Sequence, residues 1–383
     1  MRELPKMLKS KLFERKVNNA LRQLGIQNNL VDFSSNDYLG FSRSKNLFNS
    51  THNYLLEHNI SQNGATGSRL LSGNHQLYNT VETMLCEFHN SESALVFNSG
   101  YDANVGFFSS VPHRDDIILY DQYVHTSIRD GITLSNAKSY KFKHNDLEDL
   151  QNKLSLCTQS ISSENNIYIV TESVFSMDGD SPDLLVISQI CKNHSAYFIV
   201  DEAHAVGVFG ENGEGLIQEL KLEDDVFARL VTFGKGLGCH GAAILGSKAL
   251  KQYLVNFARS FIYTTGLPPH SLATIKMAHG ELAETIEIDK LYHNIHFFKS
   301  EIIKHKLEHH FIESNSAIHS CVIAGNDTVK SIAQKLQKQG FDVKPILTPT
   351  VSKGKERLRF CLHSYNSEKE ITKVLMLLTS YIH

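Results

Sequence analysis

A lysine in a glycine-rich segment is the strongest candidate for chemistry in this sequence. Lys235 follows the apolar run from Arg229 to Phe233, and residues 233–238 read FGKGLG. An apolar run bounded by turn residues predicts a buried strand, and the glycines allow a sharp turn close to neighbouring backbone. An apolar setting favours the neutral amine of a lysine, which can form an imine. A surface lysine in a glycine-rich turn is the open alternative, and the phosphate-loop pattern GxxxxGK[ST] is not matched.

An acidic residue ends a second apolar run upstream. Tyr197 to Val200 predicts another buried strand, which leads into the sequence DEAH at residues 201–204. An acid at the carboxyl end of a strand points into the crevice where open α/β sheets bind ligands. Beside an imine-forming lysine, a buried aspartate can keep a pyridine nitrogen protonated. Asp201 alone could equally cap a helix, but together with Lys235 it predicts pyridoxal phosphate as the cofactor.

Polar groups follow three further apolar runs. The sequence NSGY at residues 98–101 opens a predicted helix, whose N-terminus is suited to a cofactor phosphate. His125 follows the run that ends at Tyr120, and its ring could stack on a cofactor, although a lone histidine is more often structural. Residues 171–179, TESVFSMDG, place hydroxyl groups after the third of these runs, residues 167–170. Because all these groups fall at or just after strand ends, the sequence predicts one shared ligand site.

Strands and helices alternate through most of the chain. Short apolar runs predict strands at residues 94–97, 117–120, 167–170, 197–200, 229–233 and 243–245, with helical spacing between most of them. This rhythm predicts an α/β fold with a mainly parallel sheet between helices. Beyond about residue 270 the pattern predicts a smaller α+β domain. The expected parts are an N-terminal helix and substrate-contacting arm (1–45), a large cofactor-binding domain (46–270) and a small C-terminal domain (271–383). An amphipathic helix is expected at about residues 11–30, with Leu12, Val17, Leu21 and Leu24 facing inward.

Composition narrows the class of protein. The chain has 383 residues, 41% hydrophobic and 21% charged, with a formal net charge of −3. These values are typical of a globular protein and argue against nucleic acid as the main partner. No apolar run reaches the length of a membrane span. The six cysteines are scattered singly, a pattern that favours reduced thiols and a cytoplasmic location. His305, His309 and His310 lack a carboxylate or cysteine at ligand spacing, so no metal site is predicted.

The motifs NDYLG, GATGSRLLSG, TESVFSMDGDSP, DEAHAVGVFG, VTFGKGLG and FIYTTGLPP occur in this order along the chain. In this order and spacing the sequence resembles the α-oxoamine synthases over nearly its whole length. This resemblance implies the pyridoxal-phosphate-dependent transferase fold (type I) and an acyltransferase acting as a homodimer. The implied reaction joins L-alanine to a pimeloyl-thioester, carried by coenzyme A or a carrier protein, with loss of carbon dioxide.

The resemblance also implies a role for individual residues. Lys235 would bind the cofactor covalently and move the substrate's Cα proton, Asp201 would pair with the pyridine nitrogen, and His125 would stack on the ring. The other residues implied at the cofactor are His204, Gly100, Tyr101, Ser176, Thr232, Thr264 and Thr265. Those implied at the substrates are Arg22, Asn36, Thr350 and Arg359. Thr264 and Thr265 would reach the phosphate of the neighbouring subunit, which makes a two-fold dimer part of the site.

One position departs from the family pattern. The resemblance leads us to expect an arginine three residues before Thr350, where this chain has Leu347. The sequence therefore leaves open how the far carboxylate of the acyl group is held. Glycine C-acetyltransferase, 5-aminolevulinate synthase and serine palmitoyltransferase activities stay open within the same chemistry. A non-catalytic partner subunit is the alternative from another class, although such a scaffold would need neither Lys235 nor Asp201.

Overall fold

A computed structural model of the chain describes residues 3–22, 24–25, 29–160, 162 and 164–382. Packing divides the chain into two compact units. Unit 1 comprises Met1–Ser35, Met177–Gly179 and Tyr292–His383, and unit 2 comprises Asn36–Ser176 and Asp180–Leu291. These limits follow from packing alone, whereas the sequence places limits near residues 45 and 270.

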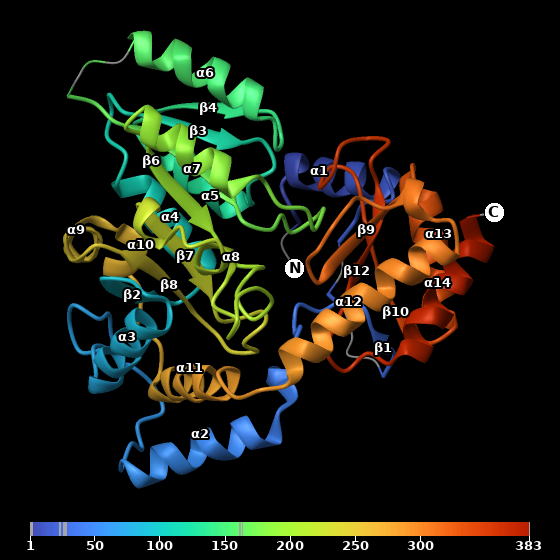
Figure 1. The fold of residues 1–383 in the computed structure, drawn as a ribbon, viewed down its shortest axis with the longest axis horizontal. Helices are drawn as coiled ribbons and strands as arrows, with labels where there is room; N and C mark the ends of the chain where they lie inside the picture. Colours follow the sequence, from blue (N-terminus) through green and yellow to red (C-terminus); the bar gives the residue numbers. More distant parts are fainter. Residues whose placement is uncertain (1–2, 23, 26–28, 161, 163, 383) are drawn as a thin grey trace. The chain divides into compact units, whose positions relative to one another are not determined.

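Unit 2 is built on a seven-stranded sheet with the order β2-β8-β7-β6-β5-β3-β4 (Figure 1). The strands are β2 (Ser93–Phe97), β3 (Ile117–Asp121), β4 (Lys138–Phe142), β5 (Ile167–Glu172), β6 (Tyr197–Asp201), β7 (Ala228–Thr232) and β8 (Ala242–Gly246). Only β8 runs antiparallel to its neighbours in this sheet, and the pairs from β7 to β4 are all parallel. The carboxyl ends of β3, β5, β6 and β7 therefore meet at one edge, where the sequence places its polar groups.

Helices surround this sheet in the way that the alternating pattern predicts. They are α2 (Lys45–Glu57), α3 (Gln76–Phe88), α4 (Gly100–Ser110), α5 (Thr126–Leu134), α6 (Leu147–Ser160), α7 (Leu184–Asn193), α8 (Leu216–Glu219), α9 (Lys248–Phe257), α10 (Arg259–Ile262) and α11 (Pro269–Leu282). Short 3-10 turns lie at Phe41–Arg43 and Glu223–Asp225. One core packs α4, α5, α9 and α10 against the sheet through side chains such as Phe107, Ile128 and Leu254. Burying these apolar side chains holds the strand ends in fixed positions.

Unit 1 contains two small sheets. Its parallel pair joins β1 (Val31–Asp32) to β10 (Phe341–Asp342), and its antiparallel sheet has the order β11 (Lys344–Ile346), β12 (Arg357–Cys361), β9 (Ile318–Val322). The remaining elements are α1 (Lys6–Val17), α13 (Asn326–Lys338), α14 (Glu368–Ile382), a 3-10 turn at Glu308–His310, and α12 (Glu287–Lys304), which begins in unit 2. This is the α+β region that the sequence predicts at the C-terminal end.

The N-terminal helix differs from its prediction. α1 ends at Val17, and Asn19 adopts a left-handed backbone with φ 49°, a conformation that asparagine tolerates and that ends a helix. The residues expected to face inward are exposed in the structure, namely Leu12, Val17, Leu21 and Leu24. The prediction of an inward-facing helix over residues 11–30 is therefore wrong, although residues 23 and 26–28 of that range lie outside the described residues.

The strands predicted from apolar runs are found within one or two residues of their expected ends, whereas β4 was missed. Its sequence, KSYKF, is polar, and four of its five residues are exposed. β4 lies at the edge of the sheet, where burial does not require an apolar run. Within the described part of the chain, no helix is both long and apolar enough to cross a membrane. All six cysteines have free thiols, as predicted.

We expect the buried histidine of α11 to make stability depend on pH. His279 is 3% exposed, its Nδ1 contacts the carbonyl oxygen of Ile275, and burial lowers its pKa from 6.5 to about 4. Between these values the unfolded chain binds the proton and the folded chain does not. The stabilisation is therefore complete above pH 6.5 and is lost as pH falls toward 4, by at most about 3 kcal/mol.

Replacing this histidine tests the effect. His279→Phe should flatten the fall in the free energy of unfolding between pH 6.5 and 4, measured by urea denaturation. The same change at the exposed His194 is the control and should leave the slope unchanged. Equal slopes for wild type and H279F would contradict the assignment.

Candidate functional site

A cavity of about 160 Å³ in unit 2 brings most of the predicted site residues together. The predicted residues that line it are Gly100, Tyr101, His125, Asp201, His204, Thr232 and Lys235. The others are Asn104, Ser127, Glu172, Ala203 and Leu230. Glu172, Asp201 and Thr232 are the last residues of β5, β6 and β7, so the cavity lies at the carboxyl edge of the sheet.

Asp201 is held by donors on two sides. Its Oδ1 accepts the backbone N–H of Ala203 at 2.9 Å, and its Oδ2 accepts from Asn104 Nδ2 at 2.8 Å. Asn104 also donates to Ser127 Oγ at 3.0 Å, and that hydroxyl lies 2.8 Å from His125 Nδ1. The carboxylate is only 5% exposed. Donors of this kind fix the orientation of the carboxylate.

Lys235 lies at one end of a chain of polar contacts. Its Nζ is 2.7 Å from His204 Nε2, and His204 Nδ1 is 2.7 Å from the hydroxyl of Tyr38. Tyr38 in turn donates to Asn36 Oδ1 at 3.3 Å. If the amine donates to Nε2, the proton of the neutral imidazole stands on Nδ1 and is donated to Tyr38. This tautomer is assigned from the contacts and satisfies each group in turn.

Glycines around Lys235 let its loop pack against other backbone. A Cβ at Gly236 would stand 2.6 Å from the carbonyl oxygen of Val206, in the turn that follows His204. Gly238 has φ 60°, and a Cβ there would collide with the backbone of Phe41 and Ser42. Both contacts bring the lysine loop against segments that carry its polar partners. The glycines beside Lys235 are therefore required because a larger side chain would collide with neighbouring backbone.

His125 and Glu172 form the wall beside Asp201. The backbone N–H of His125 donates to Glu172 Oε1, and Glu172 pairs with Asp201 in the register of β5 and β6. Burial, with the charge of Asp201 adding to it, raises the pKa of Glu172 well above its usual range. Burial also lowers the pKa of His125, which favours a neutral ring. Beside Asp201 the cavity therefore presents an imidazole that favours its neutral form and a carboxyl group that resists ionisation.

The N-terminus of α4, whose Gly100 and Tyr101 line the cavity, is suited to an anion. α4 begins at Gly100, and its N-cap Ser99 accepts from the backbone N–H of Asp102. The cavity is lined there by Gly100, Tyr101 and Thr232. Helix N-termini bind phosphate through free N–H groups and the helix dipole. Nearby, Asn98 Nδ2 donates to Thr264 Oγ1 at 3.0 Å and to the carbonyl oxygen of Thr265 at 2.7 Å.

Several predicted residues do not line this cavity. Ser176 lies half-buried in the loop after β5, and Thr264 and Thr265 lie before α11. Asn36 reaches the site only through its contact with the hydroxyl of Tyr38. The predicted substrate residues Arg22, Thr350 and Arg359 belong to unit 1: Arg22 and Thr350 are exposed, and Arg359 is 9% exposed on β12. Their roles, like the other individual roles, stay predictions.

Four functional residues were missed from the sequence: Tyr38, Asn104, Ser127 and Glu172. Glu172 lies two residues after the predicted strand 167–170, in a segment singled out for its hydroxyl groups, so its position was a usable signal. Tyr38 lies within the NDYLG segment, but nothing in that segment indicates that its hydroxyl contacts His204. Asn104 and Ser127 stand on helices, and only the packing of α4 and α5 on the sheet brings them to Asp201.

Comparison with known proteins agrees with this geometry. The family model for class I and II aminotransferases matches residues 28–377. The chain belongs to this family. Across 370 residues it is 39% identical to 8-amino-7-oxononanoate synthase from Emericella nidulans, covering 92% of this chain and 89% of that one.

Solved structures of the family are also similar. A high-resolution structure of SPT with a PLP internal aldimine matches with a TM-score of 0.89 at 25% identity, over 99% of this chain and 98% of that chain. The 8-amino-7-oxononanoate synthase of Francisella tularensis matches with a TM-score of 0.78 at 30% identity, over 93% and 98%. Family membership confirms the predicted transferase fold, the pyridoxal phosphate cofactor and the resemblance to α-oxoamine synthases.

The residues in the cavity fit this family's cofactor. The cavity offers an amine that can condense with an aldehyde, a buried carboxylate that can pair with a pyridinium nitrogen, and an imidazole that can lie against a ring. The α4 N-terminus supplies N–H groups for a phosphate. Each part of pyridoxal phosphate thus has a complementary group in the same unit.

We expect Asn104 to contribute to cofactor affinity through Asp201. Asn104→Ala leaves Asp201 Oδ2 without its side-chain donor, so the charged carboxylate is held more weakly. Because a hydrogen bond to a charged group contributes about 1.5–3 kcal/mol, the affinity for pyridoxal phosphate should fall on the order of tenfold. Fluorescence titration of the apo-protein measures this loss. Asn256→Ala, which removes a side chain bonded to Gln252 on α9, is the control; equal losses in both variants would contradict the role.

Proposed function

We propose that this enzyme condenses L-alanine with a pimeloyl-thioester to give 8-amino-7-oxononanoate, carbon dioxide and the free thiol, a step of biotin biosynthesis. The observation that carries the proposal is the convergence of Lys235 Nζ and the Asp201 carboxylate on one cavity. The relative from Emericella nidulans, which bears the name of this activity, supports the choice of member. The acyl carrier is coenzyme A or a carrier protein.

The cofactor is held by groups already described. Lys235 would bond its aldehyde carbon, Asp201 its ring nitrogen, and His204 its ring oxygen. His125 would lie against the ring, and the α4 N-terminus with Thr232 would bind the phosphate, aided by Ser176 and by Thr264 and Thr265 from a second copy of the chain. Bound pyridoxal phosphate supplies a ring that accepts electron density from the amino acid's Cα, which carbon–carbon bond formation and decarboxylation both require.

The chain's own residues then orient the substrate and move protons. Lys235 Nζ would take the Cα proton of L-alanine and later return one to the product. The chain of contacts from His204 to Tyr38 and Asn36 holds this amine in place. Asp201, held by Ala203 and Asn104, would stabilise positive charge on the ring nitrogen. Holding both reactants in one site supplies a further part of the rate.

Serine palmitoyltransferase activity is the second candidate. The structure of SPT has a higher TM-score, 0.89, than the 8-amino-7-oxononanoate synthase of Francisella tularensis, 0.78. Sequence identity favours the oxononanoate synthases, at 39% and 30% against 25%. The whole group shares this fold, so structural similarity does not distinguish its members. Sequence identity along the chain is therefore the better guide to the reaction.

Turnover of a substrate panel tests the reaction. Glycine, L-alanine and L-serine, each with acetyl-, succinyl-, pimeloyl- and palmitoyl-coenzyme A, should give release of carbon dioxide and thiol fastest for L-alanine with the pimeloyl-thioester. Lys235→Ala should abolish turnover and the absorbance band of the bound cofactor. Preference for L-serine with palmitoyl-coenzyme A would identify the second candidate, and absence of turnover with every pair would favour the non-catalytic subunit.

A further inference from the structure

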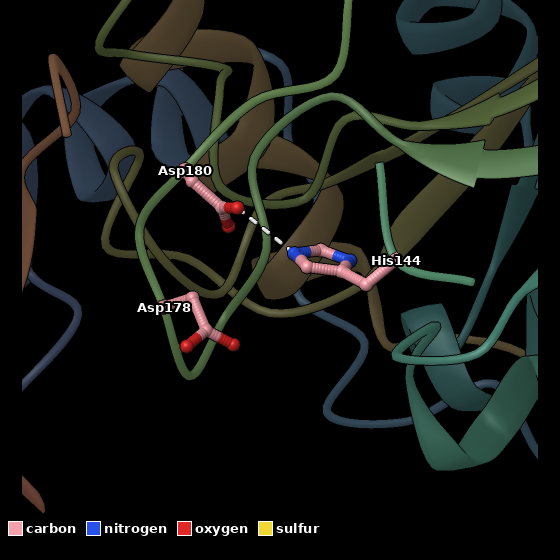
Figure 2. Close-up of side chains that lie close together, drawn as sticks. All are labelled: His144, Asp178 and Asp180. Carbon is pink, nitrogen blue, oxygen red and sulfur yellow. Dashed lines mark hydrogen bonds and ion pairs between the residues drawn. The ribbon is translucent and has the colours of Figure 1, made fainter. Parts of the chain in front are cut away.

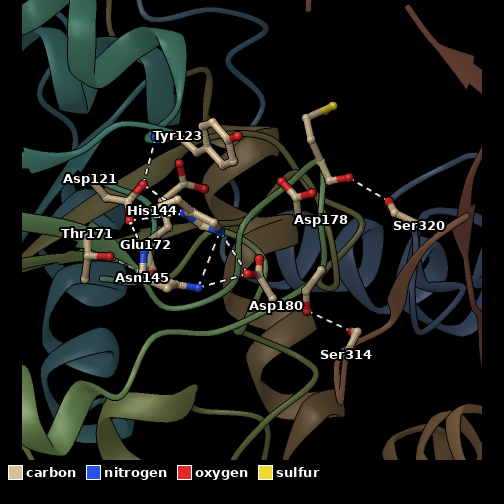
Figure 3. Close-up of polar contacts among 12 residues, drawn as sticks. Asp121, Tyr123, His144, Asn145, Thr171, Glu172, Asp178, Asp180, Ser314 and Ser320 are labelled. Carbon is tan, nitrogen blue, oxygen red and sulfur yellow. Dashed lines mark hydrogen bonds and ion pairs between the residues drawn. The ribbon is translucent and has the colours of Figure 1, made fainter. Parts of the chain in front are cut away.

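Three loops of unit 2 meet at one histidine (Figures 2 and 3). His144 follows β4, and its Nδ1 lies 3.0 Å and 3.1 Å from the two carboxylate oxygens of Asp121. Its Nε2 lies 2.8 Å from Asp180 Oδ2. A neutral imidazole has only one N–H, so contact of both nitrogens with carboxylates requires the imidazolium form. The geometry therefore indicates a protonated histidine between two acids.

The surroundings of the ring favour this charge. Burial alone would lower the pKa of His144, but the hydrogen bonds to Asp121 and Asp180 outweigh it and raise the pKa to about 9. Tyr123 and Phe175 pack against the ring, each with centroids 4.4 Å away. A cation thus already occupies the space between the two carboxylates at neutral pH, and this argues against a metal ion there.

Other titratable groups near the cluster are engaged elsewhere. Glu172 ends β5, and burial raises its pKa, so it adds little negative charge. Asp178 precedes Asp180 by two residues, and its carboxylate accepts from Arg357 within unit 1. The charge of His144 is therefore balanced mainly by Asp121 and Asp180.

The same two acids hold loops that carry site residues. Asp121 Oδ1 accepts the backbone N–H of Tyr123 at 2.7 Å, two residues before His125. The carbonyl oxygen of Asp180 accepts the backbone N–H of Phe175 at 3.0 Å, directly before Ser176. Through its ring, His144 connects the loop after β3 to the loop after β5 (Figure 3).

The neighbouring Asn145 strengthens the same connection. Its backbone N–H donates to Asp121 Oδ2 at 2.9 Å, and its side-chain amide donates to Asp180 Oδ2 at 2.9 Å. The segment after β4 therefore bonds both acids twice, once through the imidazolium and once through Asn145. Such duplicated, charge-assisted contacts restrict the two loops to one relative arrangement.

We propose that His144 is a positioning residue of the cofactor site, whose imidazolium between Asp121 and Asp180 fixes the loops that present His125 and Ser176. The inference rests on the proposed function only through the roles given to His125 and Ser176. His144 itself touches neither substrate nor cofactor and acts through Asp121 and Asp180.

Hydrogen–deuterium exchange of the apo-protein gives the first test. His144→Gln keeps a donor for one acid and removes the charge, so amides in the segments 121–125 and 173–180 should exchange on the order of tenfold faster. His113→Gln, a matched change at an exposed histidine of the same unit, should leave both segments unchanged. Equal exchange in the two variants would overturn the proposal.

A pH profile of cofactor affinity separates positioning from simple packing. In the wild type the affinity for pyridoxal phosphate should fall as pH rises through about 9, where His144 loses its proton. Asp180→Asn keeps an oxygen acceptor for His144 but removes one of the two charges, so the fall should move toward neutral pH.

The outcomes are distinguishable from failure of the proposed reaction. Neither measurement uses an amino acid or a thioester, so the result can be read even if L-alanine is not the substrate. Should H144Q not fold, D180N still gives the profile. Superimposable profiles for wild type and D180N would overturn the proposal, whereas a profile moved toward neutral pH, with faster exchange in H144Q, would support it.

Discussion

A buried ion pair between two neighbouring strands is the contact on which the site most depends. Glu202 directly follows Asp201, and its carboxylate accepts from Arg229 Nε at 2.8 Å, with Arg229 Nη2 at 2.6 Å. Arg229 stands on β7, six residues before Lys235. Both side chains are almost fully buried, and Arg229 also donates to the carbonyl oxygens of His89 and Glu214. The pair therefore holds the carboxyl end of β6 against the start of β7, and these two strands lead to Asp201 and Lys235 at one cavity.

Such a pair favours one arrangement of the two strands more than it raises the free energy of unfolding. Removing one member of a buried ion pair leaves an unpaired charge and costs about 3–5 kcal/mol, although an apolar pair of the same size can be as stable. Here Glu202 also accepts the backbone N–H of Ile217 at 3.0 Å, so the acid connects β6, β7 and α8. A chain with apolar residues at both positions could keep its sheet and still lose the alignment of the catalytic groups.

The sequence was sufficient for the sheet and for the residues at its carboxyl edge. Buried parallel strands need apolar runs, and polar residues that follow them must lie at one edge, so Asp201 and Lys235 could be found without coordinates. Contacts between helices and strands could not be found in this way. Asn104 and His144 reach their partners only through tertiary packing, and no local pattern distinguishes them from other polar residues. The prediction for the N-terminal helix was wrong for a related reason. Its apolar side chains are exposed in the structure, and the local sequence pattern alone does not show whether another element packs against them.

The steric contact at Gly238 has a consequence for engineering. Because any side chain there would push against the backbone of Phe41 and Ser42, it would displace the segment that carries Tyr38 and so disturb the lysine indirectly. Directed evolution toward new acyl or amino donors should therefore hold this glycine constant.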